Sequence, residues 1–270
     1  MVVARGKLNW TVESLPAGSM HPQGVRSVTD AEIGVVFQPI VEIATGRIFA
    51  QEVLARCRHP DYPTPTVLFE HAAKEGACGR LGRLIRDIAF AGIEDTTLFF
   101  NVHPDELSSR WLVQPDDPVG FQPRPVYLEI TEAAAFTHHE LCTSVLKELC
   151  RRTGALLVVD DFGAGHSNLE RVVALEPAVV KLDLALTQGI HTSKTKQIVV
   201  KHMVNLCRDL GARVVAEGVE VIDELSCVRD CGVDLAQGYL LARPATPAPE
   251  AVWPLPPRRV SKSKRPGKRT

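Results

Sequence analysis

Short apolar runs alternate with amphipathic segments along most of this chain. The apolar runs end in turn residues, which is typical of buried β-strands. In the amphipathic segments, apolar residues recur every three to four positions, as Leu141, Val145 and Leu149 do, which indicates helices. We expect strands at 35–43, 48–56, 98–102, 126–130, 156–159, 178–182, 213–216 and 235–237. We expect helices at 66–75, 80–92, 104–112, 138–152, 195–210 and 221–231, with a short helix ending near residue 174.

The order of these elements predicts an α/β fold. Repeated alternation of strand and helix implies a parallel sheet with helices outside it. Eight strands between residues 32 and 246 fit a closed, TIM-like (β/α) barrel. The first two strands could form a hairpin across Thr45–Gly46, and Pro39 favours an edge or an end for the first of them. An open doubly wound sheet is the alternative, although no Gly-rich dinucleotide loop follows the first strand.

Composition separates one folded unit from two chain ends. Apolar residues make up 45% of the 270 residues and charged residues 23%, which suits a globular domain with a large core. We place that domain at 32–246, after an N-terminal arm at 1–31 that is too short for a separate domain. Residues 247–270 are Pro-rich and then basic, so we expect a disordered tail there.

Charge and hydropathy exclude several classes of protein. Residues 251–270 hold seven Lys or Arg and no acid, so a net charge of −1 leaves −8 on the rest of the chain. No aromatic residue lies among the tail's lysines, so the tail supports non-specific attraction to anions but no specific nucleic-acid recognition. No apolar run approaches the roughly 18 residues of a membrane span, and the N-terminus lacks an apolar signal core. We therefore expect a cytoplasmic protein, and its seven cysteines, which include no C-x-x-C pair, to be reduced.

Polar residues gather where the predicted strands end. Leu156–Val159 runs into Asp160 and Asp161, and a Gly-x-Gly turn follows. A turn alone could explain this pair, since Asp is common in turns. The pattern recurs along the chain, however, and the ends of parallel barrel strands converge on one face, where active sites are built. The polar strand ends are Glu52, Asn101, Glu129, Asp160, Asp161, Lys181, Glu217 and Gln237.

The five carboxylates in this set would repel one another unless a cation lay between them. Hard oxygen ligands select Mg²⁺ or Mn²⁺. Six candidate metal ligands are too many for one Mg²⁺ that keeps its waters, so we expect two metals sharing a carboxylate, an arrangement that promotes in-line displacement at phosphorus. Lys181 would orient water or stabilise phosphate charge, a simple salt bridge being the alternative. His103, two residues after Asn101, is a candidate to line the same cleft.

Seven motifs resemble, in order, those of the EAL-domain cyclic di-GMP phosphodiesterases. They are EVLAR at 52–56, FNV at 100–102, LEITE at 128–132, DDFGAG at 160–165, VKLD at 180–183, AEGVE at 216–220 and QGYLLARP at 237–244. The resemblance implies an EAL-type barrel whose first strand is antiparallel to the others. It also implies two-metal hydrolysis of cyclic di-GMP to linear pGpG with Mg²⁺ or Mn²⁺. A homodimer pairing near the DDFGAG loop, with His166 and Asn168 close to the interface, is implied as well.

The resemblance assigns roles to individual residues. One metal would be held by Glu52, Asn101, Glu129 and Asp160, and the second by Asp160, Asp161 and Glu217. Lys181 matches a lysine that orients water and is the catalytic residue together with Asp160, Asp161 and Glu217. The substrate-binding positions are Gln38, Leu54, Arg56, Asp183, Gln237 and Pro244. Supporting roles fall to Glu132, which would hold the DDFGAG loop, and to Glu220.

The chain departs from the family pattern in four places. Val53 replaces the Ala of the E-A-L motif, Leu241 replaces a Phe, His166-Ser167-Asn168 replaces an aromatic-Ser-Ser sequence, and a Pro-rich stretch at 113–125 replaces a longer helix. None of these changes removes a chemical group from the metal site. A catalytically silent cyclic di-GMP receptor or protein-interaction module on the same fold is the alternative function. Such a protein should lose metal ligands, whereas here every ligand position is filled; the sequence identifies no upstream regulatory partner.

Overall fold

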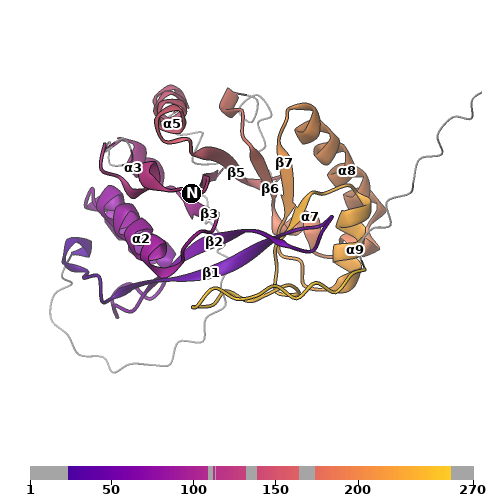
Figure 1. Ribbon diagram of the computed structural model, residues 1–270, viewed down its shortest axis with the longest axis horizontal. Helices are drawn as coiled ribbons and strands as arrows, with labels where there is room; N and C mark the ends of the chain where they lie inside the picture. The colour runs from indigo at the N-terminus through magenta and orange to yellow at the C-terminus, as the bar shows by residue number, and fades with distance from the viewer. Residues whose placement is uncertain (1–23, 109–111, 113, 132–138, 164–173, 257–270) are drawn as a thin grey trace, which may run out of the picture.

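The computed structural model describes residues 24–108, 112, 114–131, 139–163 and 174–256. Its strands close into one barrel in chain order (Figure 1). They are β1 (Ile33–Glu42), β2 (Ile48–Cys57), β3 (Leu98–Asn101), β4 (Val126–Thr131), β5 (Leu156–Phe162), β6 (Val179–Leu182), β7 (Arg213–Ala216) and β8 (Leu235–Ala236). β1 is antiparallel to β2 and β8, and all other neighbouring strands are parallel. The predicted barrel and its antiparallel first strand are confirmed, and the open sheet is excluded.

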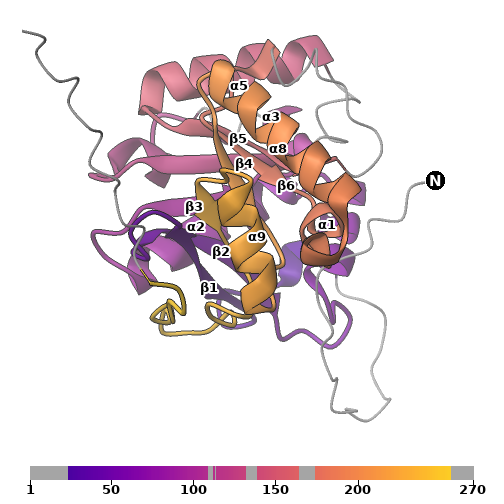
Figure 2. The ribbon, with the colours of Figure 1, turned by 90° about the vertical axis from the view of Figure 1, so that its right-hand side faces the viewer.

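Helices and helical turns connect the parallel strands on the outside of the barrel. Between β2 and β4 lie α1 (Pro65–Lys74), α2 (Cys78–Gly92), α3 (Pro104–Ser108) and the 3₁₀ turn η2 (Pro118–Phe121). Later come α5 (His139–Thr153), α7 (Leu184–Thr187), η3 (Ile190–Thr192), α8 (Lys194–Asp209) and α9 (Ile222–Asp230). Figure 2 shows α8 and α9 together on one side of the barrel, where α8 packs on β7.

The predicted helix at 104–112 is seen only as α3, and the short helix expected before residue 174 lies outside the described residues. The Pro-rich stretch contributes η2 alone among its described residues. The described residues of this stretch therefore form no long helix, as the prolines predicted.

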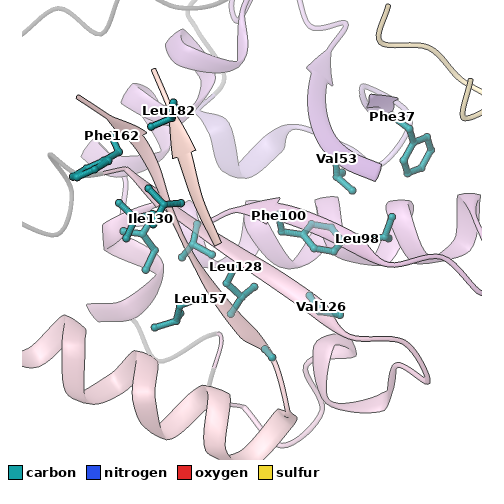
Figure 3. Close-up of a cluster of buried hydrophobic side chains, with 14 of the residues drawn as sticks. Phe37, Val53, Leu98, Phe100, Val126, Leu128, Ile130, Leu157, Phe162 and Leu182 are labelled. Carbon is teal, nitrogen blue, oxygen red and sulfur yellow. The ribbon is translucent and has the colours of Figure 1, made fainter. Parts of the chain in front are cut away.

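Alternate residues of each strand pack on opposite faces of the barrel wall, because successive side chains of a strand point to opposite sides. On β4, Val126, Leu128 and Ile130 belong to the larger cluster between the strands and the helices, part of which Figure 3 shows. Tyr127, between them, belongs to a second cluster inside the barrel. That inner cluster takes one residue from every strand: Ile40, Ala50, Phe99, Tyr127, Val158, Val179, Val215 and Leu235.

Residues 245–256 run beside β1 (Figure 1). Ala245 and Phe37 exchange two backbone hydrogen bonds, of 2.9 and 3.0 Å, and Trp253 packs against the core. The segment has room because β8 is so short that it pairs only with Val41 and Glu42. The structure thus differs from the predicted disordered tail at residues 247–256, while 257–270 lie outside the described part.

The same short β8 explains Pro39, which lies inside β1 rather than at its end. No residue of β8 pairs with Pro39, so this part of β1 is locally an edge and tolerates a residue without an N–H. At the other end of the described chain, Val25 and Val28 are buried, and the N–H of Val25 donates to Glu75 Oε1 at 3.0 Å. The described residues of the N-terminal arm therefore pack on the domain.

A buried ion-pair network fixes the start of α3. Arg86 of α2 donates to Glu106 at 2.8 Å and to Asp117 at 2.9 Å, and all three side chains are buried. The second oxygen of Glu106 accepts the N–H of His103 at 3.2 Å. Burial raises the pKa of Glu106, and the charge of Arg86 opposes that shift. The network ties α2 to the loop that follows Asn101, and so supports one rim of the barrel.

We expect Gly82→Ala to destabilise the protein by about 1–3 kcal/mol, the usual cost of overpacking a core. A Cβ atom at Gly82 would lie 2.1 Å from Glu106 Oε2, so the carboxylate would have to leave Arg86 or α2 would have to move. Gly92→Ala in the same helix is the matched control, since its Cβ would come no closer than 3.6 Å to Phe37. Urea unfolding measures the difference, and equal stability of the two variants would contradict this account.

Candidate active site

A layer of polar side chains lies next to the inner apolar cluster at one end of the barrel. Side chains two residues apart on a strand share a face, so Tyr127 is followed on that face by Glu129. On β1, which runs the other way, Ile40 is preceded by Gln38. The same step of two residues from each inner apolar residue leads to the whole polar layer: Gln38, Glu52, Asn101, Glu129, Asp160, Lys181, Glu217 and Gln237. The structure thereby brings the predicted strand-end residues together.

Lys181 lies among the acids of this layer and is fully buried. Its Nζ is 2.9 Å from both Glu129 Oε2 and Glu217 Oε1, 3.4 Å from Glu52 Oε1 and 3.5 Å from Asp160 Oδ1. Burial alone would lower the pKa of Lys181, but these four carboxylates, Asp160 first among them, hold it well above its ordinary value. Lys181 is therefore a cation that contacts four acids, which is more than a simple salt bridge.

Amide side chains hold the carboxylate of Glu52 in place. Asn101 Nδ2 donates to Glu52 Oε1 at 3.3 Å, and Gln237 Nε2 donates to Glu52 Oε2. The same nitrogen of Gln237 donates to Gln38 Oε1 at 3.2 Å, and Gln38 lies directly opposite Glu52 in the β1–β2 pairing. β1 lies between β2 and β8 in the closed ring, so Gln38 of β1 contacts Gln237, and Gln237 in turn contacts Glu52 of β2.

A β-bulge brings both Asp160 and Asp161 to the site. In a regular strand, adjacent side chains point to opposite faces. Here the β5–β6 pairing shifts between Val159 and Phe162, and Asp161 has a φ of 58°, a left-handed conformation that Asp tolerates better than most residues. The N–H of Asp161 donates to Asp160 Oδ1 at 2.9 Å. As a result, one carboxylate oxygen each of Asp160, Asp161 and Glu217 lies within 4.8 Å of the other two.

Negative charge exceeds positive charge among the described side chains of this layer. Burial raises the pKa of Glu129 well above its ordinary value; Lys181 opposes the shift, and Glu52 and Asp160 add to it. Glu52, Asp160 and Glu217 all lie within 3.5 Å of the same cation, Lys181. Such a cluster gains stability when further positive charge enters it.

The oxygen atoms of the layer fit divalent metal ions. Glu129 Oε1 is buried and has no hydrogen-bond partner among the described residues, which is an unusual state for a carboxylate oxygen. A cation would satisfy it, and the group formed by Asp160, Asp161 and Glu217 offers three more oxygens at short range. Since carboxylate and amide oxygens are hard ligands, the donor set suits Mg²⁺ or Mn²⁺ better than zinc or copper.

A cavity of about 540 Å³ opens beside the polar layer and is lined by Leu54, Arg56, Asn101 and His103. His103 lines this cavity together with Asn101, and its ring stacks on Phe69 with the centroids 5.8 Å apart. Arg56 is half-buried, and its Nη1 donates to the carbonyl of Ala55 at 2.7 Å. Burial lowers the pKa of Arg56, but a guanidinium remains charged in proteins. The cavity therefore combines apolar walls with two guanidinium groups, that of Arg56 and that of Arg86, which pairs with Glu106 and Asp117.

The structure places the other predicted residues less centrally. Asp183 caps α7, its Oδ1 accepting the N–H of Ala185 at 2.7 Å. Pro244 is partly buried and precedes the segment that pairs with β1. Glu132, His166 and Asn168 lie outside the described residues.

Glu224 is a residue of this region that sequence reasoning missed. Glu220, predicted to support the site, has an exposed side chain. The buried Glu224 instead accepts backbone N–H bonds from Glu220 at 3.0 Å, from Val221 at 3.3 Å and from Gly189 at 2.7 Å. It thus holds the loop that follows Glu217. Its position, three residues after Val221 at the start of a helix, is where a capping glutamate is common, and that pattern could have indicated it.

Fold and site together define a closed (β/α) barrel whose first strand is antiparallel and whose strand ends form an acidic centre suited to divalent metals. The family model described as EAL domain matches residues 25–244. The chain belongs to the EAL-domain family.

Several relatives of this chain are known. It is 32% identical over 239 residues to the cyclic di-GMP phosphodiesterase RocR of Pseudomonas aeruginosa. The aligned region covers 82% of this chain and 59% of RocR. Klebsiella pneumoniae BlrP1, solved at pH 8.0 as a calcium and cyclic di-GMP complex, has 33% identity and a TM-score of 0.68 over 83% of this chain and 58% of its own. Its manganese and cyclic di-GMP complex at pH 6 has 34% identity and a TM-score of 0.67, covering 79% of this chain and 56% of its own.

The chain thus spans a little over half the length of these relatives. The shared part is the EAL domain, which occupies most of this chain. Among the helices that the structure describes, none has the length and apolar character needed to cross a membrane.

Proposed function

We propose that this protein is a divalent-metal-dependent phosphodiesterase that hydrolyses cyclic di-GMP to linear pGpG. The observation that carries the proposal is the convergence of Glu52, Glu129, Asp160 and Glu217 around Lys181, with Asp161 next to Asp160 and Glu217. A buried oxygen of Glu129 also has no hydrogen-bond partner among the described residues. Relatives named as cyclic di-GMP phosphodiesterases, and relatives solved with calcium or manganese and cyclic di-GMP, support both the substrate and the type of metal.

The side chains of the site would have different roles, which follow from their chemistry. Glu52, Asn101, Glu129, Asp160, Asp161 and Glu217 would hold two metal ions. Bound divalent ions polarise a phosphodiester and lower the pKa of water. Lys181 would donate from Nζ to the attacking water while its charge holds Glu129 and Glu217 in place. Arg56 would bind a phosphate of the substrate in the cavity, and Gln38 and Gln237 would keep Glu52 oriented.

We expect turnover to require Mg²⁺ or Mn²⁺ and to vanish in excess EDTA, because carboxylates alone cannot activate water. Ca²⁺ should inhibit, since its longer bonds and looser geometry would misplace the water. The measurement is chromatographic analysis of purified protein incubated with cyclic di-GMP, with pGpG as the expected product. Full activity in EDTA would overturn the proposal. Binding of cyclic di-GMP without any cleavage would instead favour the silent receptor.

A second expectation separates binding from chemistry at Arg56. Arg56→Ala should weaken cyclic di-GMP binding by about tenfold to a hundredfold, because hydrogen bonds to charged groups contribute about 1.5–3 kcal/mol. Its effect on turnover at saturating substrate should be smaller. Arg56→Lys is the matched control, which keeps the charge but loses the planar guanidinium. Its affinity for cyclic di-GMP should lie between those of the unchanged protein and Arg56→Ala. Calorimetry in Ca²⁺ measures affinity without cleavage; unchanged affinity in Arg56→Ala would remove this residue from the binding site.

The homodimer near the DDFGAG loop also remains a proposal. Residues 164–173, which include His166 and Asn168, are outside the described part of the chain, so it rests on the family resemblance. Light scattering of active protein tests it, and a strictly monomeric mass at full activity would contradict it.

A further inference from the structure

Three side chains with metal-binding atoms meet at the foot of α2, outside the acidic layer. Cys78 is the first residue of α2, His103 directly precedes α3, and Asp105 is the second residue of α3. One atom of each, the Sγ of Cys78, an imidazole nitrogen of His103 and a carboxylate oxygen of Asp105, lies within 4.8 Å of the other two. The tertiary fold brings them together, since Cys78 is far from the other two in the sequence.

The three residues sit on well-packed backbone. Cys78 is 1% exposed, and its thiol lies 3.9 Å from the carbonyl oxygen of Phe69. The ring of His103 stacks on Phe69 at an interplanar angle of 13°, and its Nδ1 accepts the N–H of Asp105 at 3.2 Å. The backbone of His103 is itself held by the buried network of Glu106. The positions of the ligand atoms are therefore set by packing on both sides of the cluster.

We propose that Cys78, His103 and Asp105 form a second metal site, which binds Zn²⁺ or a chemically similar divalent ion. Sulfur and imidazole ligands suit zinc, whereas Mg²⁺ prefers oxygen. Zinc bonds of about 2.0–2.3 Å would require the ligand atoms to approach one another by about 1 Å. Three protein ligands leave the fourth position of a tetrahedral ion to water. The side chains of His103 and Asp105 are 31% and 39% exposed, so an ion can enter from solvent.

Metal binding at this site replaces the thiol proton. Burial, and then the charges of Asp105 and Glu106, raise the pKa of Cys78 to about 12, so the free protein carries the thiol form at neutral pH. The metal–sulfur bond forms as the S–H bond breaks, and one proton passes to solvent for each ion bound. No oxidant or reductant takes part. The bound ion would link the start of α2 to the segment that follows β3.

The two sites differ in the atoms that bind metal, so metal binding at each site can be measured separately. The acidic layer offers only oxygen and an amide, so Co²⁺ bound there gives no thiolate-to-metal charge-transfer band in the near ultraviolet. We would titrate Co²⁺ into the full chain in excess Mg²⁺. The expected result is a thiolate band that saturates at one equivalent and disappears when Zn²⁺ is added. Failure of the proposed phosphodiesterase activity would not affect this result.

Matched variants assign the band to its ligands. Cys78→Ser should abolish it, whereas Cys227→Ser, which removes a partly buried thiol of a different helix, should leave it unchanged. Asp105→Asn alters a half-exposed ligand and should weaken Co²⁺ binding at least about tenfold. It serves as the deciding variant if Cys78→Ser does not fold, as judged by its thermal midpoint. No thiolate band in the unchanged protein, a band that survives Cys78→Ser, or unaltered affinity in Asp105→Asn would overturn the proposal.

Discussion

Asp160→Asn is expected to lower turnover of cyclic di-GMP by at least about a thousandfold, or roughly 4 kcal/mol of transition-state stabilisation. The substitution keeps the size of the side chain, and the remaining oxygen can still accept the N–H of Asp161. It removes the charge of an acid that lies 3.5 Å from Lys181 and belongs to the group formed with Asp161 and Glu217. The measurement is the initial rate at saturating metal and substrate.

The same variant should be at least as stable as the unchanged protein in chelator. Without metal, Asp160 belongs to a set of acids that repel one another around a single lysine, so the loss of one charge relieves repulsion. Asp95→Asn is the matched control, because Asp95 is exposed and pairs only with Arg124 among the described ion pairs. It should leave turnover unchanged.

Two outcomes for Asp160→Asn would count against this account. Turnover within about tenfold of the unchanged protein, a loss of only about 1.4 kcal/mol, would mean that the acids are not the reaction centre. An inactive variant that also melts earlier in chelator would favour a structural role for Asp160.

Lys181→Met is expected to have the opposite effect on the metal-free protein. Methionine fills a similar volume, but four buried carboxylates lose the cation they contact. Removing one partner of a buried charge cluster costs about 3–5 kcal/mol, so the free energy of unfolding in chelator should fall by about that amount. Turnover should fall by about a hundredfold or more, because a preorganised donor to the reaction centre is gone.

Added Mg²⁺ should restore part of the stability of Lys181→Met but none of its activity. Metal ions can neutralise the acids, whereas they cannot replace the ammonium group as a donor to water. Lys147→Met is the matched control: Lys147 is exposed, contacts Glu176 at 2.9 Å and should change stability by at most about 1 kcal/mol. Denaturant unfolding with and without Mg²⁺ gives the comparison. A stable, active Lys181→Met would show that the lysine is dispensable for both fold and chemistry.

The apolar pattern by itself determined the order of strands and helices along the chain, and it favoured a closed barrel over an open sheet. Each strand is short and apolar, and a helix or helical turn separates most strands from the next, which leaves few topologies other than a closed parallel ring. The same pattern determined which residues share a level inside the ring. A strand repeats every two residues, so Tyr127 and Glu129, or Val179 and Lys181, had to face the same way. Strand periodicity is therefore enough to identify the polar strand ends.

The sequence could not determine how these residues contact one another. That Lys181 reaches four acids depends on the registers of five strands, and adjacent Asp160 and Asp161 share a site only because of a bulge at a left-handed residue. The role of Glu224, which binds N–H groups of its own helix start and of Gly189, also depends on how two loops meet.

Residues 247–256 had the composition of a disordered tail, yet Ala248, Ala251 and Trp253 pack against the core. They follow Ala245, which pairs with β1 where β8 is too short to cover that strand. Cys78 likewise meets His103 and Asp105 only where the start of α2 approaches the loop after β3. Local preferences and strand periodicity are properties of neighbouring residues and can be predicted from sequence. Register, bulges and the filling of an open strand edge are set by contacts between residues far apart in the chain, and those contacts exist only once the barrel has closed.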